Sequence, residues 1–207
     1  MSYWHGGYDH DSEQSRSSFS PPRSSSWSTR PLSRGSGWRR CAAGSEFVLA
    51  CDMRFAARES AIFCQFEPAF GQLPGGGAAQ LLTRLMGRAR APEVMLSAED
   101  YDADLAERYG WINRALPGDA FGDFVNSLAH RVAGFPAAGH VVVKDRVNAI
   151  ALAPVEDFRR DSDLFGEEVR APGAERLIAA ALKRGFRTRD AELTLGHLLG
   201  ELTEPDP

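Results

Sequence analysis

Residues 41–77 read CAAGSEFVLACDMRFAARESAIFCQFEPAFGQLPGGG, and this stretch decides the fold. Small residues precede a short apolar run at 46–51, a pattern typical of a helix whose amino terminus another group approaches closely. Two short β-prone pieces follow at 53–56 and 61–63, and a Pro-Gly-Gly-Gly turn at 74–77 ends the stretch. Short strands mixed with helix predict an α/β fold.

Downstream of this stretch the pattern becomes largely helical. Leucine and methionine at i, i+4 spacing predict a helix that follows the turn and ends at Gly87, and a second helix covers 89–96. A helix at 102–109 stops at Gly110, and a strand at 111–116 comes next. The remaining predicted helices cover 119–133, 137–149, 155–165, 173–184 and 188–202.

Upstream, residues 1–40 consist mainly of Ser, Arg, Gly, Pro and aromatic residues without periodicity. Such a segment buries too little apolar surface to offset its chain entropy, so we expect it to be disordered and no part of the fold. Out-of-frame translation of GC-rich DNA gives a similar composition, which makes a frameshift or a misplaced start one hypothesis for 15–40. The folded part is then a core at 41–150 and a helical carboxyl-terminal region at 151–207.

Composition limits the classes of function. The formal net charge of -4 gives no reason to expect nucleic acid, and no apolar stretch reaches the length that spans a membrane. Cys41, Cys51 and Cys64 are odd in number and lack CxxC spacing, so we expect buried apolar thiols rather than disulfides or a zinc site. A cytoplasmic location follows, and no metal is expected.

Three pieces of the sequence together resemble a known family. GSEFVLACDMRFA at 44–56, FCQFE at 63–67 and GQLPGGGAAQ at 71–80 occur in the order and spacing of the crotonase, or enoyl-CoA hydratase/isomerase, signature. The resemblance implies a crotonase-like β-β-α spiral, truncated at the amino terminus, with a helical carboxyl-terminal part.

The resemblance also implies a chemistry. In this family a CoA thioester carbonyl faces two backbone N–H groups, while two carboxylates hold a water and add it across the α,β double bond. Matching positions assign the carboxylates to Glu46 and Glu67, one oxyanion donor to the N–H of Ala43, and a water-holding backbone to Gly75. CoA belongs to the substrate, so no separate cofactor is expected.

Several positions depart from the family pattern. Ala42 and Cys64 stand in place of glycine and Phe66 in place of proline, as in a divergent branch. The second oxyanion donor normally comes from an upstream A-x-S-x-G-x-D loop, and residues 1–40 contain no match to it.

The favoured interpretation is an enzyme of the lyase type that hydrates an α,β-unsaturated acyl-CoA, since both carboxylates are retained. We expect a homo-oligomer, a trimer or hexamer, because crotonases commonly assemble through carboxyl-terminal helices. The leucine rows after Ala174 are either core or subunit contacts, and the resemblance favours subunit contacts. One alternative is a catalytically incomplete fragment that keeps the oligomerisation surface. Another is an interaction protein that works through its amino-terminal arm.

Overall fold

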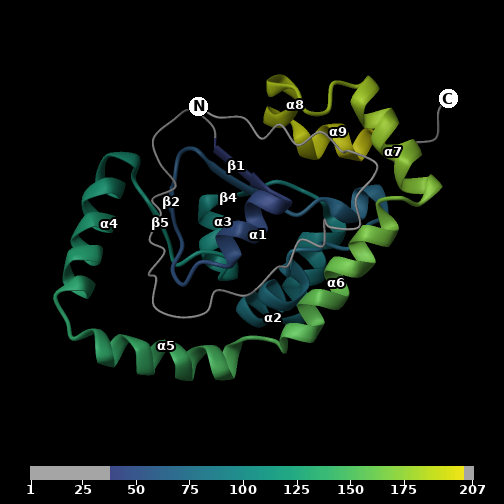
Figure 1. Ribbon diagram of the computed structural model, residues 1–207. Coiled ribbons are helices and arrows are strands. Elements are labelled where there is room, and N and C mark those ends of the chain that lie inside the picture. Colours follow the sequence, from purple (N-terminus) through teal and green to yellow (C-terminus); the bar gives the residue numbers. More distant parts are fainter. Residues whose placement is uncertain (1–37, 203–207) are drawn as a thin grey trace, which may run out of the picture.

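The computed structural model describes residues 38–202, so the predictions made for residues 1–37 lie outside it. The strands are β1 (Trp38–Cys41), β2 (Phe55–Ala57), β3 (Ala61–Cys64), β4 (Tyr101–Asp102) and β5 (Arg114–Leu116). The helices are α1 (Ala43–Leu49), the 3-10 helix η1 (Glu67–Phe70), α2 (Ala78–Ser97), α3 (Ala103–Tyr109), α4 (Gly118–Ala133), α5 (Ala137–Ala151), α6 (Val155–Glu168), α7 (Pro172–Lys183), α8 (Arg189–Leu193) and α9 (Leu195–Glu201). Figure 1 shows their arrangement.

The strands form two small sheets, with the orders β1-β3-β4 and β2-β5. The pairs β1–β3 and β2–β5 are parallel, which requires crossover connections, and α1 lies in the first of them. Strand β1 begins at Trp38, inside the segment predicted to lie outside the fold. Its sequence, WRRC, shows no alternation of polar and apolar residues, and only the pairing with β3 makes it a strand.

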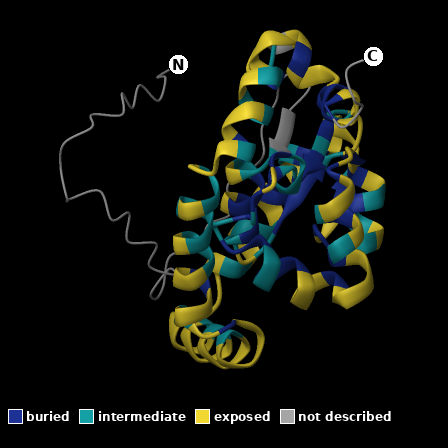
Figure 2. Ribbon diagram, turned by 90° about the vertical axis from the view of Figure 1, so that its right-hand side faces the viewer, coloured by how far each residue is buried: buried dark blue, intermediate teal, exposed yellow. Residues whose placement is uncertain are grey.

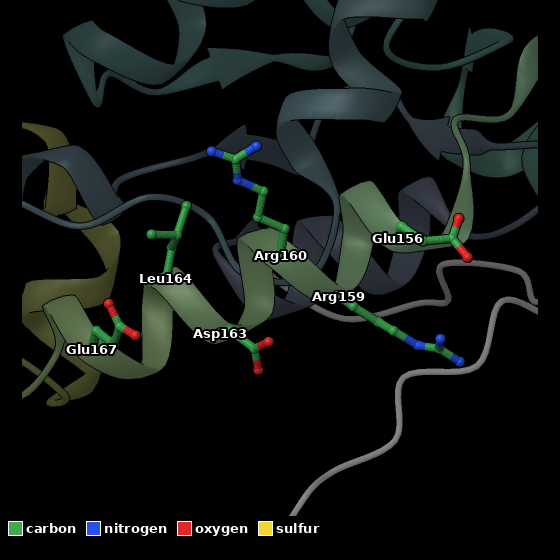
Figure 3. Close-up of a pocket in the computed structure, with 6 residues that line it drawn as sticks. All are labelled: Glu156, Arg159, Arg160, Asp163, Leu164 and Glu167. Carbon is green, nitrogen blue, oxygen red and sulfur yellow. The ribbon is translucent and has the colours of Figure 1, made fainter.

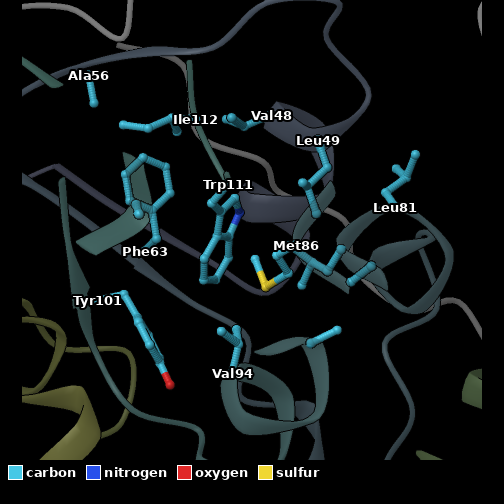
Figure 4. Close-up of a cluster of buried hydrophobic side chains, with 14 of the residues drawn as sticks. Val48, Leu49, Ala56, Phe63, Leu81, Met86, Val94, Tyr101, Trp111 and Ile112 are labelled. Atoms are coloured by element: carbon cyan, nitrogen blue, oxygen red, sulfur yellow. The ribbon is translucent and has the colours of Figure 1, made fainter. Parts of the chain in front are cut away.

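The main core lies between the sheets and helices α1 to α3. Trp111 is fully buried, with its ring 5.6 Å from that of Phe63 and 5.9 Å from that of Tyr101 between centroids. Met86 and Val94 of α2 complete this packing (Figure 4). Burial of several large apolar side chains in one contiguous cluster is the main stabilising contribution to such a fold.

Glycine positions were predicted correctly as breaks. Gly87 has φ 82° and ψ 165° and separates two helical halves of α2. Gly110 ends α3 in the left-handed conformation. Both backbones are ones that glycine adopts without the Cβ penalty.

Helices α4 and α5 extend along the periphery of the molecule (Figure 1). Helix α5 has no buried residue and is exposed over most of its length in Figure 2, where it lies at the bottom. Its exposed apolar side chains include Val142, Val147 and Ile150. Within residues 38–202 we find no helix long and apolar enough to cross a bilayer.

The carboxyl-terminal leucines correct one prediction. Leu195, Leu198 and Leu199 are buried in the chain's own second core, so they cannot serve as subunit contacts. Leu182 and Leu193 remain exposed. The single helix predicted at 188–202 is in fact α8 and α9, separated at Thr194.

The cysteines correct a second prediction. Cys41 and Cys64 form a disulfide, with Cα atoms 4.4 Å apart, although the sequence predicted no disulfide. The reason is register: β1 and β3 pair so that these two residues lie directly opposite each other. Cys51 lies outside the disulfide and is partly buried, and its thiol donates to the carbonyl of Phe47 at 3.6 Å.

Candidate active site

Glu46 lies in the first turn of α1 and is buried, with 8% of its surface exposed. One carboxylate oxygen accepts hydrogen bonds from the N–H groups of Gly76, at 2.7 Å, and Ala78, at 3.2 Å. Burial raises the pKa of Glu46, the two N–H donors oppose that rise, and the charge of Asp161 adds to it. The Pro-Gly turn thus holds this carboxylate where α2 begins.

Glu67 begins η1 and is 5% exposed. The side-chain amide of Gln65 donates to both carboxylate oxygens, at 2.9 and 2.8 Å. Burial and then the charge of Glu46 raise the pKa of Glu67 to about 7. The two predicted carboxylates are therefore buried and electrostatically coupled.

Helix α6, which is distant in sequence, packs against the glycine turn. A Cβ on Gly75 would lie 2.7 Å from the side chain of Phe165, and one on Gly77 would lie 2.6 Å from the ring of Phe158. The N–H of Leu73 donates to the carboxylate of Glu168 at the end of the same helix. Glycine is needed here because the phenylalanine rings contact the backbone itself.

Close approach also explains Gly76. A Cβ at this position would lie 2.5 Å from a carboxylate oxygen of Glu46. Only a residue without a side chain lets its N–H reach that carboxylate.

The predicted oxyanion donor, Ala43, is the first residue of α1 and is exposed. Ala42 before it has φ 49° and ψ -126°, a backbone that favours glycine, the usual family residue there. Gly75 lies in the same turn as the donor to Glu46. The roles of the Ala43 and Gly75 backbones stay predictions.

A buried carboxyl pair can exchange protons with a bound reactant. Two coupled carboxyl groups can share a proton, since ionising one disfavours ionising the other. Within the described residues one group has potential metal-ligand atoms close together, namely Cys41, Cys64 and Asp100. Both sulfurs are joined in the disulfide, so we assign no metal to it.

Two cavities lie apart from the carboxylates. One of about 410 Å³ runs along α6 and is lined by side chains of mixed charge (Figure 3), namely Glu156, Arg159, Arg160, Asp163, Leu164 and Glu167. The other, of about 340 Å³, has mostly apolar walls from α1, α2 and α5 and includes the Lys144–Asp52 ion pair. Neither Glu46 nor Glu67 lines them.

Sequence reasoning missed three contributors to this region. Gln65, the α6 phenylalanines and the disulfide act through contacts between distant or irregular segments. Gln65 carried one weak signal, its place two residues before Glu67, but nothing in the sequence gives its side-chain direction.

Comparison with known proteins gives the same family. The enoyl-CoA hydratase/isomerase family model matches residues 37–173. The short-chain-enoyl-CoA hydratase of Clostridioides difficile is 35% identical over 127 residues, which are 59% of this chain and 79% of that protein. A "probable enoyl-CoA hydratase" of Rhizobium meliloti is 33% identical over 123 residues, 59% of this chain and 48% of that protein.

Solved structures agree with the fold. The crystal structure of "a putative enoyl-CoA hydratase from Streptomyces avermitilis" superposes with a TM-score of 0.78 at 49% identity, covering 80% of this chain and 60% of that one. An enoyl-CoA hydratase from Mycobacterium avium subsp. paratuberculosis gives 0.67 at 27% identity, covering 72% and 60%. The predicted crotonase-like α/β fold is therefore confirmed.

The chain spans only part of the length of its relatives. This chain spans about half of the Rhizobium relative and 60% of the Streptomyces structure. The family model nevertheless covers well over half of the 207 residues. The chain therefore belongs to the enoyl-CoA hydratase/isomerase family.

Proposed function

We propose that this protein binds an acyl-CoA thioester and hydrates its α,β double bond with Glu46 and Glu67. The observation that carries the proposal is the coupling of these two buried carboxyl groups, one with its pKa raised to about 7. A general acid or base works best when its pKa lies near the working pH.

The surroundings of the two groups suggest their separate roles. Glu46 accepts two backbone N–H bonds, which favour its ionised form, so it acts as the base that takes a proton from water. Burial and then the charge of Glu46 raise the pKa of Glu67 to about 7, so protonated Glu67 is populated near neutral pH and serves as the proton donor.

In the proposed step the water oxygen bonds to the β carbon while its proton moves to Glu46. The proton of Glu67 goes to the α carbon, and the double bond becomes single. The thioester oxygen, negatively charged in between, accepts a hydrogen bond from the N–H of Ala43. Transfer of a proton from Glu46 back to Glu67 restores the pair, so atoms and charge balance.

A non-catalytic role is the second candidate, favoured by one observation. The sequence contains no A-x-S-x-G-x-D loop, from which the family's other oxyanion donor comes. With one donor missing, the loss in rate is of the order of 10²- to 10³-fold. This candidate keeps the fold and assembly but predicts no turnover.

Two measurements separate the candidates. Calorimetry with crotonyl-CoA should give saturable binding, and the absorbance of its conjugated thioester should fall with time if hydration occurs. Glu46→Gln should lower kcat by about 10²- to 10⁴-fold, whereas Glu175→Gln, an exposed residue of α7, should not. A folded protein with neither turnover nor binding supports the non-catalytic candidate and contradicts the enzyme and its substrate class. Binding without turnover contradicts hydration but keeps the acyl-CoA ligand.

The predicted trimer or hexamer completes the proposal, whereas the predicted cytoplasmic location loses its premise, because Cys41 and Cys64 form a disulfide. The exposed apolar side chains of α5 support assembly, because a second copy could cover them. Sedimentation at several protein concentrations tests it, and a purely monomeric chain would contradict it.

A further inference from the structure

The Cys41–Cys64 disulfide lies where both segments of the candidate active site leave the sheet. Cys41 is the last residue of β1 and Cys64 the last of β3, opposite each other in register. From Cys41 the chain continues to Ala43, the predicted oxyanion donor. From Cys64 it continues to Glu67.

Hydrogen bonds connect the two bridged segments to the backbone of Glu46 and to the carboxylate of Glu67. The N–H of Ala42 donates to the carbonyl of Cys64 at 3.2 Å, and the carbonyl of Ala42 accepts from the N–H of Glu46 at 3.0 Å. On the other side Gln65, the residue after Cys64, donates from its side chain to Glu67. The backbone of Glu46 and the carboxylate of Glu67 are thus each hydrogen-bonded to a residue adjacent in sequence to a bridged cysteine.

We propose that this disulfide is a redox-sensitive clasp that positions Glu46 and Glu67 relative to each other, an inference that rests on the proposed function. A dithiol reductant breaks the S–S bond: the two sulfurs take up two electrons and two protons, and the dithiol becomes a disulfide. Without the bond, the segments after β1 and β3 lose their covalent link and are held by backbone pairing and by packing in the second core.

The two cysteines of the bridge differ in burial, and a carboxylate lies beside both sulfurs. Cys64 is fully buried within the second core, whereas Cys41 is partly exposed, so Cys41 is the more accessible side of the bridge. A carboxylate oxygen of Asp100 lies within 4.8 Å of both sulfurs. A negative charge there disfavours thiolates and hence favours the oxidised form.

The first experiment compares the full-length protein before and after treatment with dithiothreitol. Alkylation in denaturant, followed by mass spectrometry, should find one reactive cysteine before reduction and three afterwards. Hydration of crotonyl-CoA should lose kcat by about tenfold to a hundredfold on reduction, because a shift of about 1 Å in a catalytic group costs that much. KM should change less than kcat, because the carboxylates do the chemistry.

Two variants serve as controls. Cys41→Ser/Cys64→Ser should match the reduced protein and ignore dithiothreitol. Cys51→Ser should keep the full response, since Cys51 is outside the bridge. Three reactive cysteines before reduction, or unchanged kcat after it in an otherwise active protein, would overturn the clasp.

A second readout does not depend on activity. Amide hydrogen exchange in 42–46 and 65–70 should become about tenfold faster on reduction, while α4 keeps its rates. If crotonyl-CoA is never hydrated but exchange responds in this way, the proposed function fails and the clasp remains. Equal exchange in both redox states overturns the clasp whatever the activity.

Discussion

At the residue scale, the raised pKa of Glu67 keeps a proton available near neutral pH but lowers the free energy of unfolding there. Its folded pKa of about 7 lies above the ordinary value of 4.5. Between these values the folded state binds more protons than the unfolded state, so the free energy of unfolding falls as pH rises. Below about pH 4.5 both states are protonated and this loss disappears.

Glu67→Gln removes this titration. Above pH 7 we expect the variant to exceed the wild type in free energy of unfolding by about 3 kcal/mol, and the gap should close as pH falls to about 4.5. Urea unfolding at several pH values measures the difference. A constant difference across this range would contradict the raised pKa.

Gly76 is a second residue whose identity matters to the candidate site, because its backbone N–H donates to the carboxylate of Glu46. Gly76→Ala places a Cβ 2.5 Å from a carboxylate oxygen of Glu46, so the carboxylate must move. We expect kcat for crotonyl-CoA to fall about a hundredfold. Gly173→Ala, where a Cβ meets nothing within 4 Å, is the matched control. Equal activity of both variants would mean that the turn does not position Glu46.

At the element scale, Gly87 determines the shape of α2. Its backbone, φ 82° and ψ 165°, lies in a region that only glycine readily adopts, although a Cβ there meets nothing within 4 Å. Gly87→Ala should therefore lower the free energy of unfolding by about 1–3 kcal/mol. Gly139→Ala, within α5, should raise it by about 0.5–1 kcal/mol. Thermal unfolding of both variants tests the contrast, and destabilisation of similar size in both would contradict it.

Some of these structural features could be predicted from the sequence and others could not. Gly87 and Gly110 marked real breaks because glycine signals are local. The resemblance to the crotonase family, and no local signal, singled out Glu46 and Glu67, and the structure buries both side chains. Strand β1 depends on its partner β3, and the α6 phenylalanines reach the turn from a distant part of the chain. Such contacts leave no local periodicity to read.

At the scale of the whole molecule, the disulfide links two strands that are separated by 23 positions in sequence. Closing a loop of this length removes entropy from the unfolded chain. We expect Cys41→Ser/Cys64→Ser to lose about 3 kcal/mol of unfolding free energy. Urea unfolding measures it, with Cys51→Ser as the control, and equal midpoints for all three proteins would contradict the bond.

We propose that Glu46 and Glu67, two coupled buried carboxyl groups, hydrate an enoyl-CoA. The most direct test is the rate of crotonyl-CoA hydration by Glu67→Gln beside the wild type, both folded as judged by circular dichroism. Glutamine keeps the size of the side chain and can still hydrogen-bond to Gln65, but it supplies no proton. We expect the kcat of Glu67→Gln to be lower than that of the wild type by about 10²- to 10⁴-fold. Unchanged turnover in the variant would contradict this proposal.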